Sequence, residues 1–456
     1  MKVNRYVFRQ YDVRGVVAED FPSEFVTGLG RAFGTFVKRA GVREISISGD
    51  VRLTTPELKK QFKNGVLKTG TDVIDIGTLP TPANYYSMWK LEVGAAVQIT
   101  GSHNPAEMNG FKMSLNKSAV YGDQIQQLRA LMESEDFESG DGTEVKYCIL
   151  DEYIEMIQSK IKLERTMKLA MDCGNASACL AAPKVFSGLG AEMTELFCDV
   201  DGRFPNHHPD PTVLENVNQL ITTLKGGDFD AGLAYDGDAD RIGLIDETGN
   251  IVFADQIMAL MLPEIIQENE EVLFDVKCSQ ALEEEILRLG GRPVIWKTGH
   301  SLIKQRMKEL GCKFGGEMSG HLFFADDYFG YDDAIYVSAR VVQMLSRQEK
   351  KLSELVSALP QYYSTPEMRL ECSDDEEKFR INDEATAFFK QKYDCLDIDG
   401  VRIRFPDGWG LVRASNTQPV IVCRFEAKSE ERMKEIQQMI LSKIGELGEV
   451  DVPDVV

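Results

Sequence analysis

Apolar runs of strand length alternate with stretches of helical spacing along most of the chain. The segments 44–49, 72–77 and 94–99 are rich in apolar and β-branched residues and lead into turns, which predicts three strands. Apolar residues at helical spacing in 56–69 and 124–134 predict helices between and after them. This alternation is typical of α/β units, in which helices cover a largely buried sheet.

The same pattern restarts at 167–174 and again at 271–276, each time as a predicted strand that runs into a turn and a helical stretch. We therefore predict three similar α/β modules with mixed sheets. The last part of the chain has another rhythm, with helices predicted over 377–393 and 429–447 around strands at 400–405 and 420–426. This order predicts a smaller C-terminal α+β domain.

Composition breaks separate these parts. The stretch 134–143 is rich in Glu, Ser, Asp and Gly, the pattern changes again near Ala254, and Pro366 and an acidic run interrupt 362–376. We predict four domains around a central cleft, namely 1–145, 146–254, 255–365 and 366–456.

Charge and cysteine usage narrow the function classes. The 456 residues carry a net charge of −22, which argues against nucleic-acid and anionic-membrane partners, since both need clustered cations. An anionic small substrate stays possible if cations gather in one cleft. The N-terminus lacks a signal peptide's apolar core, and the nine cysteines form no C-x-x-C pair. We predict a cytoplasmic protein without a disulfide framework or a cysteine zinc site.

The first loop with chemical potential is T-G-S-H-N-P at 100–105, directly after a predicted strand. Ligands bind at such strand-to-loop junctions in α/β sheets. Gly101 and Pro105 would hold Ser102 on a stiff turn beside His103. Ser102 is therefore either a nucleophilic or phosphate-carrying serine, or part of a polar loop that caps the next segment.

The second loop, 236–241, reads D-G-D-A-D-R and lies between two predicted strands, 231–235 and 242–246. Three carboxylates this close repel one another, and a divalent cation such as Mg²⁺ would remove the repulsion while leaving positions for a phosphate oxygen. An EF-hand is a rival because Glu247 falls at its twelfth position, but Arg241 replaces its central glycine. A solvated acidic hairpin is the other alternative.

The third loop, 315–321, reads G-G-E-M-S-G-H. Glu317 and Ser319 are two residues apart and would point the same way from an extended loop, an arrangement suited to sugar hydroxyls. A glycine-rich surface turn is the alternative.

The fourth loop, 413–419, reads R-A-S-N-T-Q-P and contains no acid. A guanidinium fork and several hydroxyl and amide donors favour a phosphate monoester, with an ordinary β-turn as the alternative.

Further cations stand in segments that we interpret as polar turns after strands. Two arginines lie in 8–15, and single cations lie in 109–112, 275–277 and 297–301. A lone Lys or Arg is usually a solvated surface group. In a chain of net −22, however, the recurrence of these turns favours a shared anion-binding cleft.

The four loops, in this order, make the whole chain resemble the α-D-phosphohexomutase superfamily, most closely its bacterial phosphomannomutase/phosphoglucomutase branch. The resemblance implies interconversion of hexose 1-phosphate and hexose 6-phosphate, of mannose or glucose, through a phosphoserine and a 1,6-bisphosphate. It implies one Mg²⁺ per chain, sugar phosphates as the partners, and a monomer or weak dimer. The implied metal ligands are Asp236, Asp238, Asp240 and a phosphoryl oxygen on Ser102.

The resemblance also implies roles for residues of all four domains. Catalytic residues would be Ser102, His103, Lys112, Arg14, Arg241 and His321. Substrate-binding residues would be Tyr11, Lys277, His300, Glu317, Ser319, Arg413, Ser415, Asn416 and Thr417.

Some questions stay open at the level of sequence. Lys112, His103 and His321 are all candidates for the general base. A hinge is expected near 362–372, so that the cleft can close and exclude water. Ala239 replaces a more usual Gly, 49–52 reads G-D-V-R rather than the common G-R-D-x-R, and Gln418 stands at a variable position. A phosphoglucosamine mutase, a phosphatase and a non-catalytic calcium- or sugar-binding protein are the alternatives.

Overall fold

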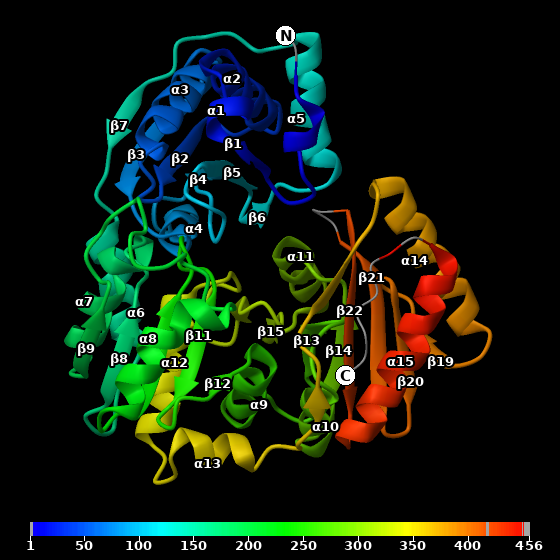
Figure 1. Cartoon of the computed structure of the whole chain (residues 1–456). Helices are drawn as coiled ribbons and strands as arrows, with labels where there is room; N and C mark the ends of the chain where they lie inside the picture. Colours follow the sequence, from blue (N-terminus) through cyan, green and yellow to red (C-terminus); the bar gives the residue numbers. More distant parts are fainter. Residues whose placement is uncertain (1–2, 416–418, 449, 451–456) are drawn as a thin grey trace. The chain divides into compact units, whose positions relative to one another are not determined.

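The computed structural model describes residues 3–415, 419–448 and 450, and internal contacts divide the chain into two compact units. Unit 1 comprises Met1–Ile257 and Ser319–Val356, and unit 2 comprises Met258–Met318 and Ser357–Val456 (Figure 1). Within the described ranges, no helix is both long enough and apolar enough to span a lipid bilayer.

The first sheet of unit 1 is mixed and runs in the order β1-β5-β4-β2-β3-β7, with β6 beside β5. The strands β4, β2, β3 and β7 are parallel to one another, whereas β5 is antiparallel to both β4 and β1. Helices α2, α3 and α5 share one apolar core with this sheet, in which the rings of Phe62 and Phe111 stack with centroids 5.2 Å apart. The elements are η1 (Arg5–Val7), β1 (Val13–Val16), α1 (Val17–Asp20), α2 (Ser23–Arg39), β2 (Glu44–Gly49), α3 (Thr55–Leu67), β3 (Asp72–Thr78), α4 (Thr81–Lys90), β4 (Ala95–Ile99), β5 (Met108–Leu115), β6 (Ser118–Ala119), α5 (Asp123–Ser134) and β7 (Glu144–Lys146).

The second sheet of unit 1 runs in the order β12-β11-β10-β8-β9. Its strands β10, β8 and β9 are parallel, and β11 closes an antiparallel hairpin with β10. Every residue of α12 is buried. The elements are α6 (Leu150–Lys160), β8 (Lys168–Asp172), η2 (Ser177–Leu180), α7 (Ala182–Gly188), β9 (Glu192–Leu196), α8 (Leu214–Lys225), β10 (Ala231–Tyr235), β11 (Ile242–Asp246), β12 (Ile251–Val252), α9 (Ala254–Ile265), β16 (Leu322–Phe324), α12 (Ala334–Ser346) and α13 (Leu352–Ser357), of which α9 and α13 cross into unit 2.

Unit 2 contains a parallel set, β14-β13-β15, and a separate antiparallel sheet in the order β17-β22-β21-β20-β19, with β18 beside β22. Helices α14 and α15 pack on the antiparallel sheet and enclose a core of their own (Figure 1). The elements are β13 (Glu271–Asp275), α10 (Gln280–Arg288), β14 (Arg292–Trp296), α11 (His300–Leu310), β15 (Phe314–Gly316), β17 (Tyr363–Ser364), β18 (Met368–Glu371), α14 (Asp375–Lys390), β19 (Asp394–Leu396), β20 (Val401–Phe405), β21 (Gly408–Ala414), β22 (Val420–Ala427) and α15 (Glu430–Leu447).

The predicted fold class is confirmed, with three α/β modules and a C-terminal α+β part. Strands β2, β10 and β11 occupy the predicted segments residue for residue. The polar turn expected at 109–112 is wrong, because these residues lie inside β5. Phe111 of β5 belongs to the apolar core. Lys112, the next residue, lies on the opposite face of the strand and forms an ion pair with Asp238.

Candidate active site

The serine loop, residues 100–105, begins directly after β4 ends, and the side chain of Ser102 reaches the predicted metal loop, residues 236–241. Ser102 Oγ donates a 2.8 Å hydrogen bond to Asp236 Oδ2, and Ser102 Oγ and His103 Nδ1 lie 3.2 Å apart. Ser102 adopts a left-handed backbone, with φ +49°, and is 2% exposed. Such a conformation costs about 1–3 kcal/mol in a non-glycine residue and is common at functional sites. The predicted nucleophile therefore faces the predicted metal ligands.

The metal loop is the tight connection between the antiparallel strands β10 and β11. Its three carboxylates are fully buried, and each offers an oxygen within 4.8 Å of the others. Asp236 Oδ1 accepts the backbone N–H groups of Asp240 and Arg241 at 3.1 and 3.2 Å. Among the described residues, Asp238 Oδ1 and Asp240 Oδ1 have no hydrogen-bond partner. Buried carboxylate oxygens without a donor fit a hard divalent cation, and the flanking strands exclude an EF-hand.

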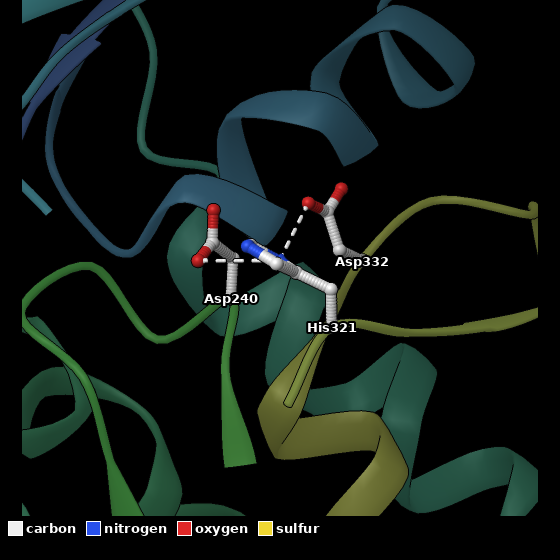
Figure 2. A group of neighbouring side chains, drawn as sticks. All are labelled: Asp240, His321 and Asp332. Carbon is white, nitrogen blue, oxygen red and sulfur yellow. Dashed lines mark ion pairs between the residues drawn. The ribbon is translucent and has the colours of Figure 1, made fainter. Parts of the chain in front are cut away.

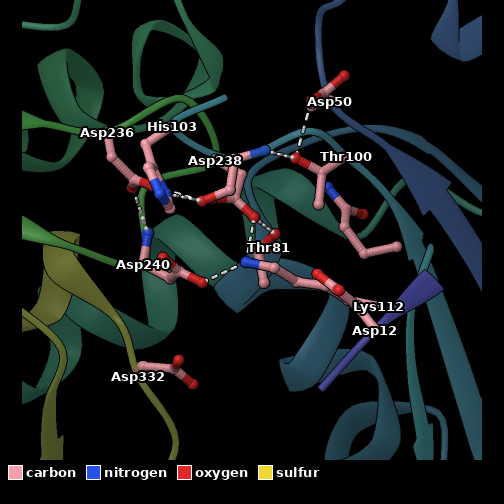
Figure 3. A network of polar contacts seen from close by, with 12 residues as sticks. Asp12, Asp50, Thr81, Thr100, His103, Lys112, Asp236, Asp238, Asp240 and Asp332 are labelled. Carbon is pink, nitrogen blue, oxygen red and sulfur yellow. Dashed lines mark hydrogen bonds and ion pairs between the residues drawn. The ribbon is translucent and has the colours of Figure 1, made fainter. Parts of the chain in front are cut away.

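Lys112 neutralises part of this charge. Its Nζ lies 2.7 Å from Asp238 Oδ2 and 2.5 Å from Asp240 Oδ2, and Thr81 Oγ1 also donates to Asp238 Oδ2 (Figure 3). Burial opposes the charge on Lys112, but the two carboxylates raise the pKa of its ammonium above the ordinary value. Burial raises the pKa of Asp236 well above the ordinary value. Lys112 is thus a fixed cation in this arrangement.

His321 links the metal loop to a carboxylate that the sequence reasoning missed. His321 Nδ1 lies 3.1 Å from Asp332 Oδ2 and 3.6 Å from Asp240 Oδ1 (Figure 2). On the other side of the ring, Arg241 Nε donates to His321 Nε2 at 3.0 Å. A guanidinium only donates, so the hydrogen-bond network assigns the lone pair to Nε2 and the proton to Nδ1. In the sequence, Asp332 and Asp333 read as the start of a helix, and nothing there singles out Asp332.

Three further predicted residues, His103, Arg14 and Tyr11, also belong to unit 1. Burial and the nearby Arg241 and Arg14 lower the pKa of His103 well below its ordinary value, so its imidazole is neutral. Arg14 lies on β1 opposite Gly110 of β5, and its Nη2 is 2.5 Å from Asp12 Oδ2. Tyr11 is half-buried in the segment before β1.

The predicted substrate-binding residues other than Tyr11 and Ser319 belong to unit 2. Lys277 follows β13, and its Nζ lies 3.2 Å from Glu367 Oε2. Glu317 is 2% exposed and accepts the backbone N–H of Gly299 at 2.5 Å, directly before His300 begins α11. Asn416 and Thr417 lie outside the described residues.

The loop 413–419, which we predicted to bind phosphate, starts inside β21 of unit 2. Arg413 is buried there, with Nε 3.1 Å from Asp399 Oδ2. Ser415 N donates to Val420 O at 3.0 Å, which continues the pairing of β21 with β22. Neither Asp399 nor Glu367 was predicted, because lone acids in polar segments carry no sequence signal.

The sequence matches four family domains across almost its whole length. They are described as phosphoglucomutase/phosphomannomutase alpha/beta/alpha domain I (residues 5–139), domain II (151–249) and domain III (253–363), and the C-terminal domain (367–443).

Individual relatives agree with these matches. The chain is 42% identical over 442 residues to a phosphomannomutase/phosphoglucomutase of Pseudomonas aeruginosa, covering 96% of this chain and 95% of that protein. It is 41% identical to a phosphoglucomutase of Neisseria meningitidis serogroup A, covering 97% of each. A crystal structure of a phosphoglucomutase/phosphomannomutase family protein from Burkholderia thailandensis superposes with a TM-score of 0.92 at 38% identity, over 98% of this chain and 100% of that one.

Proposed function

The chain belongs to the phosphoglucomutase/phosphomannomutase family, and we propose from this premise that it interconverts hexose 1-phosphates and hexose 6-phosphates of glucose, mannose or both. The carrying observation is the hydrogen bond from Ser102 Oγ to Asp236, which joins a strained serine to a buried carboxylate triad. Cations stand around this contact, as phosphoryl transfer requires, since charge develops on the transferred group.

The reaction we propose has two mirrored transfers. Phospho-Ser102 gives its phosphoryl group to the free hydroxyl of the sugar phosphate, the 1,6-bisphosphate turns over, and the other phosphoryl group returns to Ser102. Arg14 and Arg241 hold the transferred group by their guanidinium donors. Asp236, Asp238 and Asp240 would hold Mg²⁺, which supplies charge stabilisation on the phosphoryl oxygens when bound. Burial of Ser102 keeps water from competing as the acceptor.

We propose His321 as the group that takes the hydroxyl proton. Lys112 is charged between two carboxylates, so it has no lone pair to offer. His321 has its lone pair at Nε2 and its proton at Nδ1, where Asp332 stabilises the imidazolium that forms. The Nε2 contact with Arg241 would exchange for the substrate hydroxyl.

For the rest of the substrate we propose roles by chemistry. Arg413, Ser415, Asn416 and Thr417 hold the phosphate that does not react, Glu317 and Ser319 hold sugar hydroxyls, and Tyr11, Lys277 and His300 complete the binding set. Four expectations stay predictions. They are the hinge near 362–372, the cytoplasmic location, the state as a monomer or weak dimer, and the domain bounds 1–145, 146–254, 255–365 and 366–456.

The test is a coupled assay with glucose 1-phosphate and mannose 1-phosphate, with and without Mg²⁺, together with intact mass. We expect isomerisation that needs Mg²⁺, a serine-borne phosphoryl group on the parent protein, and loss of both in Ser102→Ala. Normal turnover by Ser102→Ala would contradict the proposal. Release of free phosphate at the isomerisation rate would instead identify a phosphatase.

A further inference from the structure

A buried arginine collects the backbone carbonyl groups of the serine loop. Arg52 Nη2 donates to the carbonyls of Ser102 and Asn104 at 2.7 and 2.6 Å, and Nη1 donates to those of Pro105 and Met108 at 2.6 and 3.1 Å. Arg52 is 1% exposed. One guanidinium thus fixes four peptide groups of the segment that carries the predicted nucleophile.

The same arginine is tied to the start of the loop through Asp50. Arg52 Nε lies 3.2 Å from Asp50 Oδ2. This oxygen accepts a hydrogen bond from Thr100 Oγ1 at 2.8 Å (Figure 3) and another from Gly101 N at 3.2 Å. Thr100 Oγ1 in turn accepts the backbone N–H of Ser102 at 2.9 Å. A Cβ at Gly101 would lie 2.6 Å from Arg52 Cζ, so only glycine permits this approach.

His208, which lies between β9 and α8, binds the one carbonyl group of residues 102–105 that Arg52 does not bind. His208 Nε2 donates to the carbonyl of His103. The carbonyls of all four residues from Ser102 to Pro105 therefore accept hydrogen bonds from side chains outside the loop. None of these bonds involves the Ser102 hydroxyl, which is directed to Asp236.

We propose that Arg52 is a positioning residue for phosphoryl transfer, with His208 as its second support, and this rests on the proposed function. The two half-reactions need the same placement of Ser102 Oγ against the carboxylate triad and Arg241. The left-handed backbone of Ser102 persists only where its surroundings hold it. Arg52 and His208 supply that hold through the carbonyl groups, without touching the reacting atoms.

Arg52→Lys tests the inference, because one ammonium cannot reach four carbonyls in the geometry of the fork. Arg340→Lys is the matched control, since Arg340 is also buried in unit 1 but pairs with Asp326 and packs over Phe324 and Tyr336. We expect Arg52→Lys to lower kcat by about 10²-fold at a similar KM, the loss typical of a small misplacement. The backbone amides of residues 100–108 should exchange faster with deuterium in Arg52→Lys than in the parent. The control, Arg340→Lys, should keep the parent's kcat and the parent's exchange rates.

His208→Gln and His208→Leu add a rescue comparison. The glutamine amide can still donate to the His103 carbonyl, so we expect it to keep most of the parent's kcat while leucine loses it. Unchanged deuterium exchange over 100–108 in Arg52→Lys would overturn the inference, whatever the activity. Absence of isomerisation in the parent would instead overturn the proposed function and leave the exchange result to decide on Arg52.

Discussion

Several imidazoles and cations of unit 1 have a carboxylate beside them, as Arg14 has Asp12, Lys112 has Asp238 and His321 has Asp332. His321 shows the consequence best, because two contacts together assign its tautomer. Arg241 Nε can only donate to Nε2, and Asp332 Oδ2 stands 3.1 Å from Nδ1. In the proposed mechanism, Asp332 therefore orients the imidazole of the base, His321.

We predict that Asp332→Asn lowers kcat by about 10²-fold, the usual contribution of a positioned acid–base group. An asparagine can rotate its amide N–H toward Nδ1, which moves the imidazole proton to Nε2 and removes the lone pair there. Nitrogen-15 NMR of His321 would report this tautomer change directly. Asp333→Asn is the matched control, because the neighbouring Asp333 faces tyrosines; equal losses in both variants would contradict the orienting role.

Lys112→Met gives a second prediction at this scale. The substitution leaves Asp238 and Asp240 buried without their shared cation, and removal of one partner of a buried ion pair costs about 3–5 kcal/mol. We expect a lower Tm than the parent in EDTA, and a larger rise in Tm on addition of Mg²⁺, since the ion restores the missing charge. Calorimetric scans of both proteins with and without Mg²⁺ measure this; an equal response to Mg²⁺ would contradict it.

Only some of these residues are visible in the sequence. Ser102 and the aspartates of 236–241 stand out because glycines and strands flank them, and those patterns are local. Arg52 and Asp332 act across distances of 50 residues or more, Arg52 on the Ser102 carbonyl and Asp332 on the Asp240 loop by way of His321. A lone polar residue in a sequence is by default a surface residue, so their burial and partners appear only in the fold.

At the scale of elements, the pattern of residues predicted β2, in which apolar and polar residues alternate, and β10, which has no charged residue. It failed for β5, where Asn109, Lys112 and Ser114 made a buried strand resemble a turn. Polar side chains of β5 can be buried because other segments of the chain bind them: Lys112 pairs with Asp238, and Asn109 donates a hydrogen bond to the hydroxyl of Thr54. Periodicity rules assume that each face of a strand is either apolar or solvated, whereas the face of β5 with Lys112 is polar and buried.

The buried helix α12 depends on an ionisable cap. Asp333 accepts the N–H of Tyr336 at 2.9 Å and the hydroxyls of Tyr153 and Tyr328 at 2.8 and 2.6 Å. Burial raises the pKa of Asp333 to about 6, above that of an exposed aspartate. The folded chain therefore binds this proton more tightly than the unfolded chain, and stability is lost as pH rises toward 6.

We predict that Asp333→Asn removes this loss, because the amide keeps the cap and carries no charge. Relative to the parent, the variant should gain about 1–2 kcal/mol between pH 5 and pH 7.5. The difference in Tm between the two proteins at these pH values measures the gain. A constant difference in Tm would mean that Asp333 does not titrate in this range.

At the scale of the whole molecule, the C-terminal part of unit 2 has the features of a self-contained domain. Its buried core runs from Leu370 to Ile444 and is built from β18, β20–β22, α14 and α15. Outside this core, the C-terminal part contacts residues 276–278, which follow β13: Arg402 donates hydrogen bonds to the carbonyls of Val276 and Cys278, both at 2.9 Å. Trp409 packs under this arginine, 3.8 Å from ring centroid to guanidinium carbon.

We predict that residues 366–456 expressed alone fold, because their core needs no side chain from the rest of the chain. Trp409 is the only tryptophan of this fragment, so its fluorescence reports on the contact that the fragment lacks. We expect native-like circular dichroism with a cooperative thermal transition, and an emission maximum shifted to longer wavelength, since Val276 no longer covers the ring. A fragment without helical signal would contradict the prediction and show that the fold of residues 366–456 depends on the rest of the chain.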